Sequence, residues 1–129
     1  MGRILIVFIL SGLLAFPTFS QTDKEIKDWY GEYNTMFFRG KLPKNIIIQR
    51  STDPDFLART TKIGDKFVIT FSDSYKLGEI LTELILLHEM CHVETWDEAV
   101  IGRHGPKWRV CMLKLKMQGA FDELIIEAY

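Results

Sequence analysis

Two histidines stand four positions apart in the run His88-Glu89-Met90-Cys91-His92, inside a long apolar stretch, and His104 follows twelve positions after His92. The chain has no other histidine. Residues four apart share one face of a helix at a separation of ~6 Å, so His88 and His92 can grip a single metal ion. This spacing predicts a helix that is organised around a metal.

The sequence around the motif predicts that this helix is central and buried. From about Glu79 to Trp96, little polar surface precedes His88, and a helix that is apolar on all sides belongs in a core. Buried His88 and Glu89 would be destabilising without a partner, and a metal supplies one. A loop over 97–104 then leads to Pro106, which suits the first position of a helix that ends at Gly119.

The remaining segments predict an α+β fold. Thr22-Asp23-Lys24-Glu25 resembles a capping box that starts a helix ending near Phe38. Three β segments follow at 46–48, 56–63 and 66–72, and Gly64-Asp65 suits a tight hairpin turn between the last two. Asp73 and Ser74 could cap the long helix, and Phe121 to Ala128 predicts a short last one. We expect a small antiparallel or mixed sheet packed on a central helix that carries the site.

The three histidines and Glu89 are the residue types that a zinc-dependent hydrolase requires. A catalytic zinc takes three protein ligands and keeps one position open for water. His88, His92 and His104 would be the ligands of one zinc ion per chain. Zinc lowers the pKa of that water toward ~7 and polarises a scissile carbonyl. Glu89 would act as general base, taking the water proton and passing it to the leaving amine.

Other zinc-peptidase patterns fit this sequence poorly. The metzincin pattern requires a glycine at position 95 and a histidine at position 98, where this chain has Thr95 and Glu98. A more distant glutamate ligand would have to be Glu123 or Glu127, in the separate last helix. Arg103, beside His104, is a weaker candidate for binding a developing oxyanion.

The first twenty residues have the layout of a secretory signal peptide. Arg3 supplies a positive charge, 13 mostly apolar residues run from Ile4 to Phe16, and Thr18-Phe19-Ser20 precedes an expected cut before Gln21. The apolar run is shorter than the ~20 residues of a membrane-spanning helix, so we expect no stable span after cleavage. We therefore expect an exported protein, secreted or periplasmic. A cytoplasmic location is the alternative.

The chain resembles the SprT-like domain family, which includes the Spartan proteases. The residues that carry the resemblance extend over roughly 22–120. They are Tyr33-Asn34, Phe37-Phe38, Gly40, Leu42-Pro43, the motif from His88 to His92, His104-Gly105-Pro106, Trp108 and Met112. The resemblance implies a minimal zincin-like domain over 21–129. It also implies zinc held by His88, His92 and His104, with Glu89 as the catalytic residue.

Two departures from that family bear on function. Its members that repair DNA–protein crosslinks also carry basic or zinc-binding elements outside the protease core, whereas this sequence ends at Tyr129 with a formal net charge of −1. Without residues 1–20 the balance is 15 basic against 17 acidic residues, because Arg3 is the only charge removed. We expect a protein or peptide substrate and no strong nucleic-acid binding. The alternatives are an intracellular DNA-dependent protease and a zinc-stabilised binding protein with little activity.

Four further expectations concern individual residues. Cys91 and Cys111 lie on the two helices that should pack beside the metal, and they either pair in an exported protein or remain buried thiols. Trp108 is expected in the core. Glu94, Asp97 and Glu98 are expected on a solvated face, unless one of them orients a ligand histidine. An extended substrate could add hydrogen bonds to a strand edge near Phe67 to Phe71.

Overall fold

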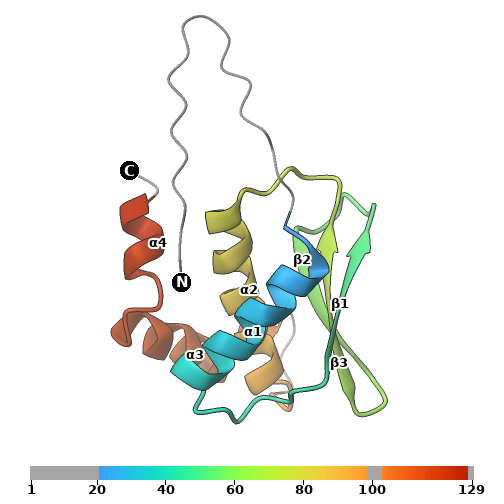
Figure 1. The fold of residues 1–129 in the computed structure, drawn as a ribbon. Coiled ribbons are helices and arrows are strands. Elements are labelled where there is room, and N and C mark those ends of the chain that lie inside the picture. The colour runs from blue at the N-terminus through green and yellow to red at the C-terminus, as the bar shows by residue number, and fades with distance from the viewer. Residues whose placement is uncertain (1–20, 99–102, 128–129) are drawn as a thin grey trace, which may run out of the picture.

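A computed structural model describes residues 21–98 and 103–127, so the predicted signal peptide lies outside the described residues. The order of elements is that of an α+β fold, as predicted. Within the described residues, one helix precedes three strands, and three helices follow them (Figure 1). All members of the described hydrophobic core lie between Ile26 and Leu124.

The first helix, α1 (Asp23–Phe37), begins where the capping box predicts. The hydroxyl oxygen of Thr22 accepts a hydrogen bond from the main-chain N–H of Glu25 at 3.1 Å. Ile26, Tyr30 and Tyr33 form its buried stripe. Gly40, with a φ of 68°, turns the chain after the helix and donates its N–H to the carbonyl of Asn34.

The strands β1 (Ile46–Ser51), β2 (Ala58–Ile63) and β3 (Lys66–Ser72) form a mixed sheet in the order β1-β3-β2. β1 is parallel to β3, and β2 is antiparallel to it through the predicted turn at Gly64 and Asp65. Because β3 is central, neither of its edges is free to bind a peptide. The expectation of a substrate-binding edge near Phe67 to Phe71 is therefore wrong.

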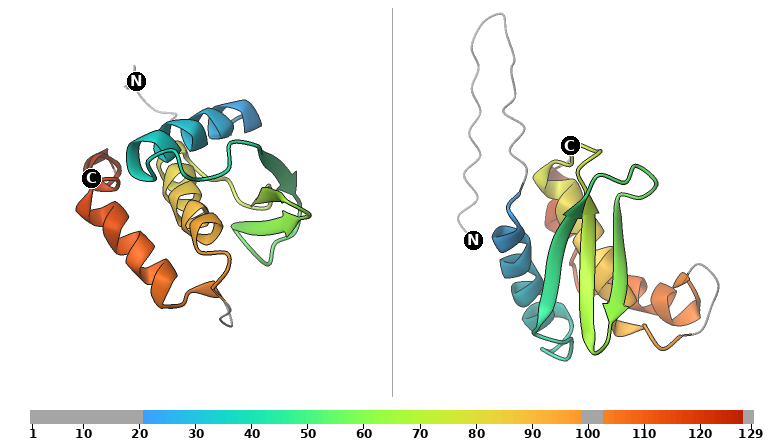
Figure 2. Two further views of the ribbon diagram at one scale, coloured as in Figure 1. Left: turned by 90° about the horizontal axis from the view of Figure 1, so that it is seen from below. Right: turned by 90° about the vertical axis from the view of Figure 1, so that its right-hand side faces the viewer.

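The helix α2 (Glu79–Glu94) lies in the middle of the fold. The sheet is on one side of it, α1 is above, and α3 (Pro106–Met117) and α4 (Asp122–Glu127) are on the other side (Figure 2, left). Gly78 is its N-cap and makes no side-chain cap hydrogen bond, so the suggestion that Asp73 or Ser74 caps it is wrong. None of the described helices is both long enough and apolar enough to cross a bilayer.

A disulfide joins α2 to α3 through Cys91 and Cys111, two buried residues separated by 20 positions in the sequence. The sequence left open whether these cysteines pair, because the spacing alone does not reveal which turns of the two helices face one another. Pro106 is the first residue of α3, as predicted. Cys111 lies further along this helix, on the side that faces Cys91 of α2.

Replacing Cys91 and Cys111 together by alanine should lower the free energy of unfolding by about 3 kcal/mol, the loop-entropy contribution of a ring of this size. Urea denaturation with and without dithiothreitol measures it. The unfolding midpoint of the unmodified chain should fall on reduction, while that of the double variant should not respond. Equal midpoints for the unmodified chain in both conditions would contradict a stabilising disulfide.

Candidate metal centre

The three histidines converge on one point. His88 and His92 stand one turn apart on α2, and their Nε2 atoms are 3.2 Å apart. The Nε2 atom of His104 lies 3.1 Å from each of them. His104 precedes α3, and Arg103 just before it has a φ of 55°, a left-handed conformation that residues with a Cβ rarely adopt. This local turn directs the chain back toward α2.

These distances match a tetrahedral metal site. Zinc binds imidazole nitrogen at ~2.0–2.1 Å, which places two tetrahedral ligands about 3.3–3.4 Å from each other. The observed separations of 3.1–3.2 Å are close to that value. The three residues accordingly form a candidate metal-binding group.

Hydrogen bonding among the rings cannot account for the cluster. An imidazole nitrogen carries either a hydrogen or a lone pair, so it cannot donate and accept at once. Among three mutually close Nε2 atoms, at least one pair must therefore present two hydrogens or two lone pairs to each other. A cation at the centre removes that repulsion, because all three nitrogens can then point lone pairs at it.

The protein environment favours the neutral form of the His88 and His92 imidazoles. Burial is the main reason that the pKa of His88 falls to about 4, and the charge of His104 lowers it further. Burial likewise lowers the pKa of His92 to about 4, with the neighbouring histidines adding to the effect. Neutral imidazole is the form that binds metals.

Trp108 forms a wall against all three rings. Its ring centroid lies 4.8 Å from that of His88, 5.5 Å from that of His92 and 4.4 Å from that of His104. Its indole N–H also points at the carbonyl of His88, at 3.4 Å. Trp108 is half-buried against the core, as expected, but its packing also orients the cluster, which the sequence did not indicate.

Glu89 is buried, with 5% of its surface exposed, and its Oε2 accepts a hydrogen bond from the hydroxyl of Thr60 at 2.6 Å. Burial raises the pKa of Glu89, and the hydrogen bonds with Thr60 oppose that rise. The sequence analysis missed Thr60. The hairpin turn could have revealed it, because pairing Ile63 with Lys66 sets Thr60 opposite Ile69, a residue of the apolar face.

Glu98 and Arg103, two charged residues close to the histidines in the sequence, differ from what the sequence led us to expect. Glu98 is half-buried, and its Oε2 accepts the main-chain N–H of Lys107 at 2.8 Å, which caps α3. The Arg103 guanidinium lies over the Trp96 ring, 3.8 Å from its centroid, and donates to the Trp96 carbonyl. Arg103 is therefore engaged with Trp96, and its contacts lend no support to a role in oxyanion binding.

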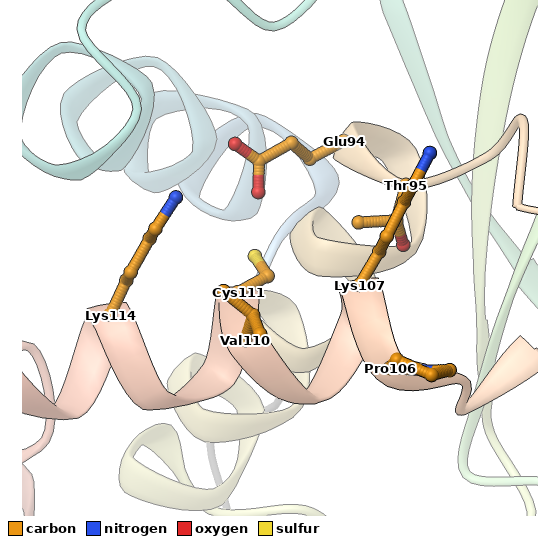
Figure 3. A pocket seen from close by; sticks show the side chains of 7 residues that line it. All are labelled: Glu94, Thr95, Pro106, Lys107, Val110, Cys111 and Lys114. Carbon is orange, nitrogen blue, oxygen red and sulfur yellow. The ribbon is translucent and has the colours of Figure 1, made fainter.

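A pocket of about 380 Å³ lies between the C-terminal end of α2 and α3, beside the disulfide (Figure 3). None of the three histidines lines it. Cys91, Glu94 and Cys111 are close enough there to suggest a second metal group. Both sulfurs are consumed by the disulfide, so this group has no thiolate to offer a metal.

Replacing His104 by alanine should lower metal affinity at least about tenfold, since even the loss of an outer-shell partner costs 10–100-fold. His104 is exposed, so the fold should persist. Metal content after dialysis against a weak chelator is the measurement. The control is Arg109→Ala, which alters another exposed residue shortly after His104 in the sequence and should leave metal content unchanged. Full retention of metal by the His104 variant would remove His104 from the ligand set.

The model of the SprT-like family matches residues 26–128. No curated protein shows significant similarity to the chain. The family match spans most of the sequence and includes the whole histidine cluster together with Glu89 and Thr60. On this match and on the α+β architecture described above, the chain belongs to the SprT-like family.

Proposed function

We propose that the protein is a zinc-dependent metallopeptidase that hydrolyses peptide bonds in protein substrates, with one zinc ion per chain. The observation that carries this proposal is the convergence of three imidazole Nε2 atoms within 3.2 Å of one another, two of them on the helix that also carries the buried Glu89 carboxylate. Three histidine ligands leave a fourth position open, as catalytic zinc sites do. A zinc site that only stabilises a binding protein normally fills that position and needs no base.

Zinc bound by His88, His92 and His104 would polarise a scissile carbonyl and lower the pKa of water toward ~7. The chain's own residues supply the proton transfers. Glu89 has one carboxylate oxygen engaged by Thr60, which leaves the other to accept a proton from water and return it to the leaving amine. Thr60 acts as a positioning residue. It orients the Glu89 carboxylate, and its hydrogen bonds oppose the rise in the pKa of Glu89 that burial causes.

The substrate would bind along the outer edge of β2. β2 pairs with β3 on one side, and in the described chain its other edge carries no strand. Thr60 links this strand directly to Glu89. An extended peptide could add main-chain hydrogen bonds to that edge and so lie next to the proposed base.

The charge distribution favours a protease that works without DNA. The chain beginning at Gln21 has more acidic than basic residues, and binding to phosphates depends on several cations that share one surface. The four basic residues of α3 divide between two directions, at the helical angles of Lys107 and Lys114 on one side and of Arg109 and Lys116 on the other.

We also propose that the protein is exported and begins at Gln21 after processing. The composition of residues 1–20 supports this, and so does the Cys91–Cys111 disulfide, because such bonds persist in oxidising compartments. Mass spectrometry of the cellular protein tests it, and an intact Met1 on a cytoplasmic protein would contradict it.

Replacing Glu89 by glutamine should keep fold and zinc but reduce turnover of an unfolded protein substrate by roughly 10²–10⁴-fold, the usual contribution of a general base. Glu94→Gln, an exposed acid on the same helix, serves as the matched control and should retain activity. Near-normal turnover in the Glu89 variant would refute its role as base. In the same assay, a large salt-sensitive stimulation by single-stranded DNA would favour the DNA-dependent alternative.

Replacing Thr60 by valine should lower kcat/KM about tenfold while zinc is retained, since a buried carboxylate oxygen loses its donor. Because the Thr60 hydrogen bond lowers the pKa of Glu89, its removal raises that pKa, and the acid limb of the pH–rate profile should move to higher pH. Thr60→Ser keeps the hydroxyl and should restore the profile. An unchanged acid limb in Thr60→Val would show that Thr60 only packs.

A further inference from the structure

An exposed apolar ridge runs along the outer side of α3. Pro106, Val110, Leu113 and Met117 recur at spacings of four, three and four residues, which is one face of a helix. Val110 is 48% exposed, Leu113 55% and Met117 79%. Cys111 and Leu115, on the opposite face, are buried. α3 is thus apolar on two opposite faces, and the fold covers one of them.

Basic side chains flank this ridge on both sides. At 100° per residue, Lys107 and Lys114 lie on one flank, and Arg109 and Lys116 lie on the other. Figure 3 shows Lys107 and Lys114 extending from the same side of the helix. α3 itself contains no acidic residue.

The neighbouring acids leave these four cations available. Glu98 binds the main-chain N–H of Lys107 and not its ammonium group. Glu94 lines the pocket across from Lys107 and Lys114, but no ion pair within the described residues joins it to either lysine. Four cations therefore surround an uncovered apolar ridge in a chain whose formal net charge is −1.

This arrangement fits an anionic lipid surface better than other occupants. A bilayer accepts apolar side chains below its headgroups while lysine and arginine on both flanks extend to the phosphates. A second copy of the chain would bring the same cations face to face. Nucleic acid would need cations that converge, whereas these point away from one another, and it would leave the ridge in water.

We propose that α3 docks flat on a membrane surface rich in anionic lipids, through the ridge of Pro106, Val110, Leu113 and Met117, with its four basic side chains at the lipid phosphates. Twelve residues of helix extend about 18 Å, which suits lying in the interface and is too short to cross a bilayer. The proposal is independent of peptidase activity. It would hold His104, just before α3, close to the membrane.

Flotation with vesicles tests it, using the chain that begins at Gln21, since the described core lies between Ile26 and Leu124. Vesicles of phosphatidylcholine with about 30% phosphatidylglycerol should bind the protein, and pure phosphatidylcholine should bind much less. Arg109→Gln with Lys116→Gln should weaken binding about 30-fold, from ~1 kcal/mol for each cation near the surface. Leu113→Ser with Met117→Ser should also reduce it severalfold.

Matched controls are Ile63→Ser, an equally exposed apolar residue at the hairpin, and Lys41→Gln with Lys44→Gln, two exposed cations away from α3. Neither should alter vesicle binding. All these side chains are exposed, and circular dichroism checks that the fold is kept.

Four results would overturn the proposal. They are no binding to anionic vesicles, equal binding to neutral ones, binding that the α3 variants leave intact, and a stable dimer in solution that Leu113→Ser with Met117→Ser dissociates. In the dimer case the ridge would be a contact between copies. Tight binding of single-stranded DNA, lost in Arg109→Gln with Lys116→Gln, would reassign the cations to nucleic acid.

Discussion

The main constraint on this structure is that three imidazole nitrogens lie within 3.2 Å of one another. No distribution of hydrogens among them satisfies every contact, so the cluster persists only if the surrounding chain holds it or a cation fills it. Two of the three rings sit on the most buried helix of the fold, where ionisation is disfavoured. The architecture thus favours a lone pair on these two rings and holds the nitrogen of the third close to them, which is the arrangement that a metal requires.

The third ring depends on connections that bring α3 to α2. The disulfide joins the two helices, Trp108 packs against all three imidazoles, and Glu98 caps the start of α3. On the approach to His104, Arg103 stacks on Trp96, whose ring in turn meets Phe67 edge-on at 5.6 Å. His104 is the most exposed of the three, and it is held by its neighbours along the chain more than by burial.

The sequence predicted the parts of this structure that periodicity and local chemistry encode. The capping box at Thr22, the turn at Gly64-Asp65 and Pro106 at a helix start each act within a few residues, and all three were confirmed. The central position of β3 was not predicted, because strand order depends on long-range packing. Thr60 was missed, and the pairing of Cys91 with Cys111 was left open, for the same reason, since each contact joins segments 20 or more residues apart. The roles of the three histidines and Glu89 came from their spacing and from the family resemblance, and they remain a proposal.

The disulfide also has a topological effect on the candidate metal centre. It closes a covalent ring from Cys91 to Cys111, and His92, His104 and Trp108 all lie within that ring, whereas His88 lies just outside it. A single break in the main chain inside the ring opens it but leaves the two fragments joined through sulfur. If the main chain were cut between His92 and His104, the disulfide would still keep the fragment that carries His104 attached to the fragment that carries His92. A peptidase working among other peptidases, or on itself, would lose its third imidazole only when a chain break and a reductant act together.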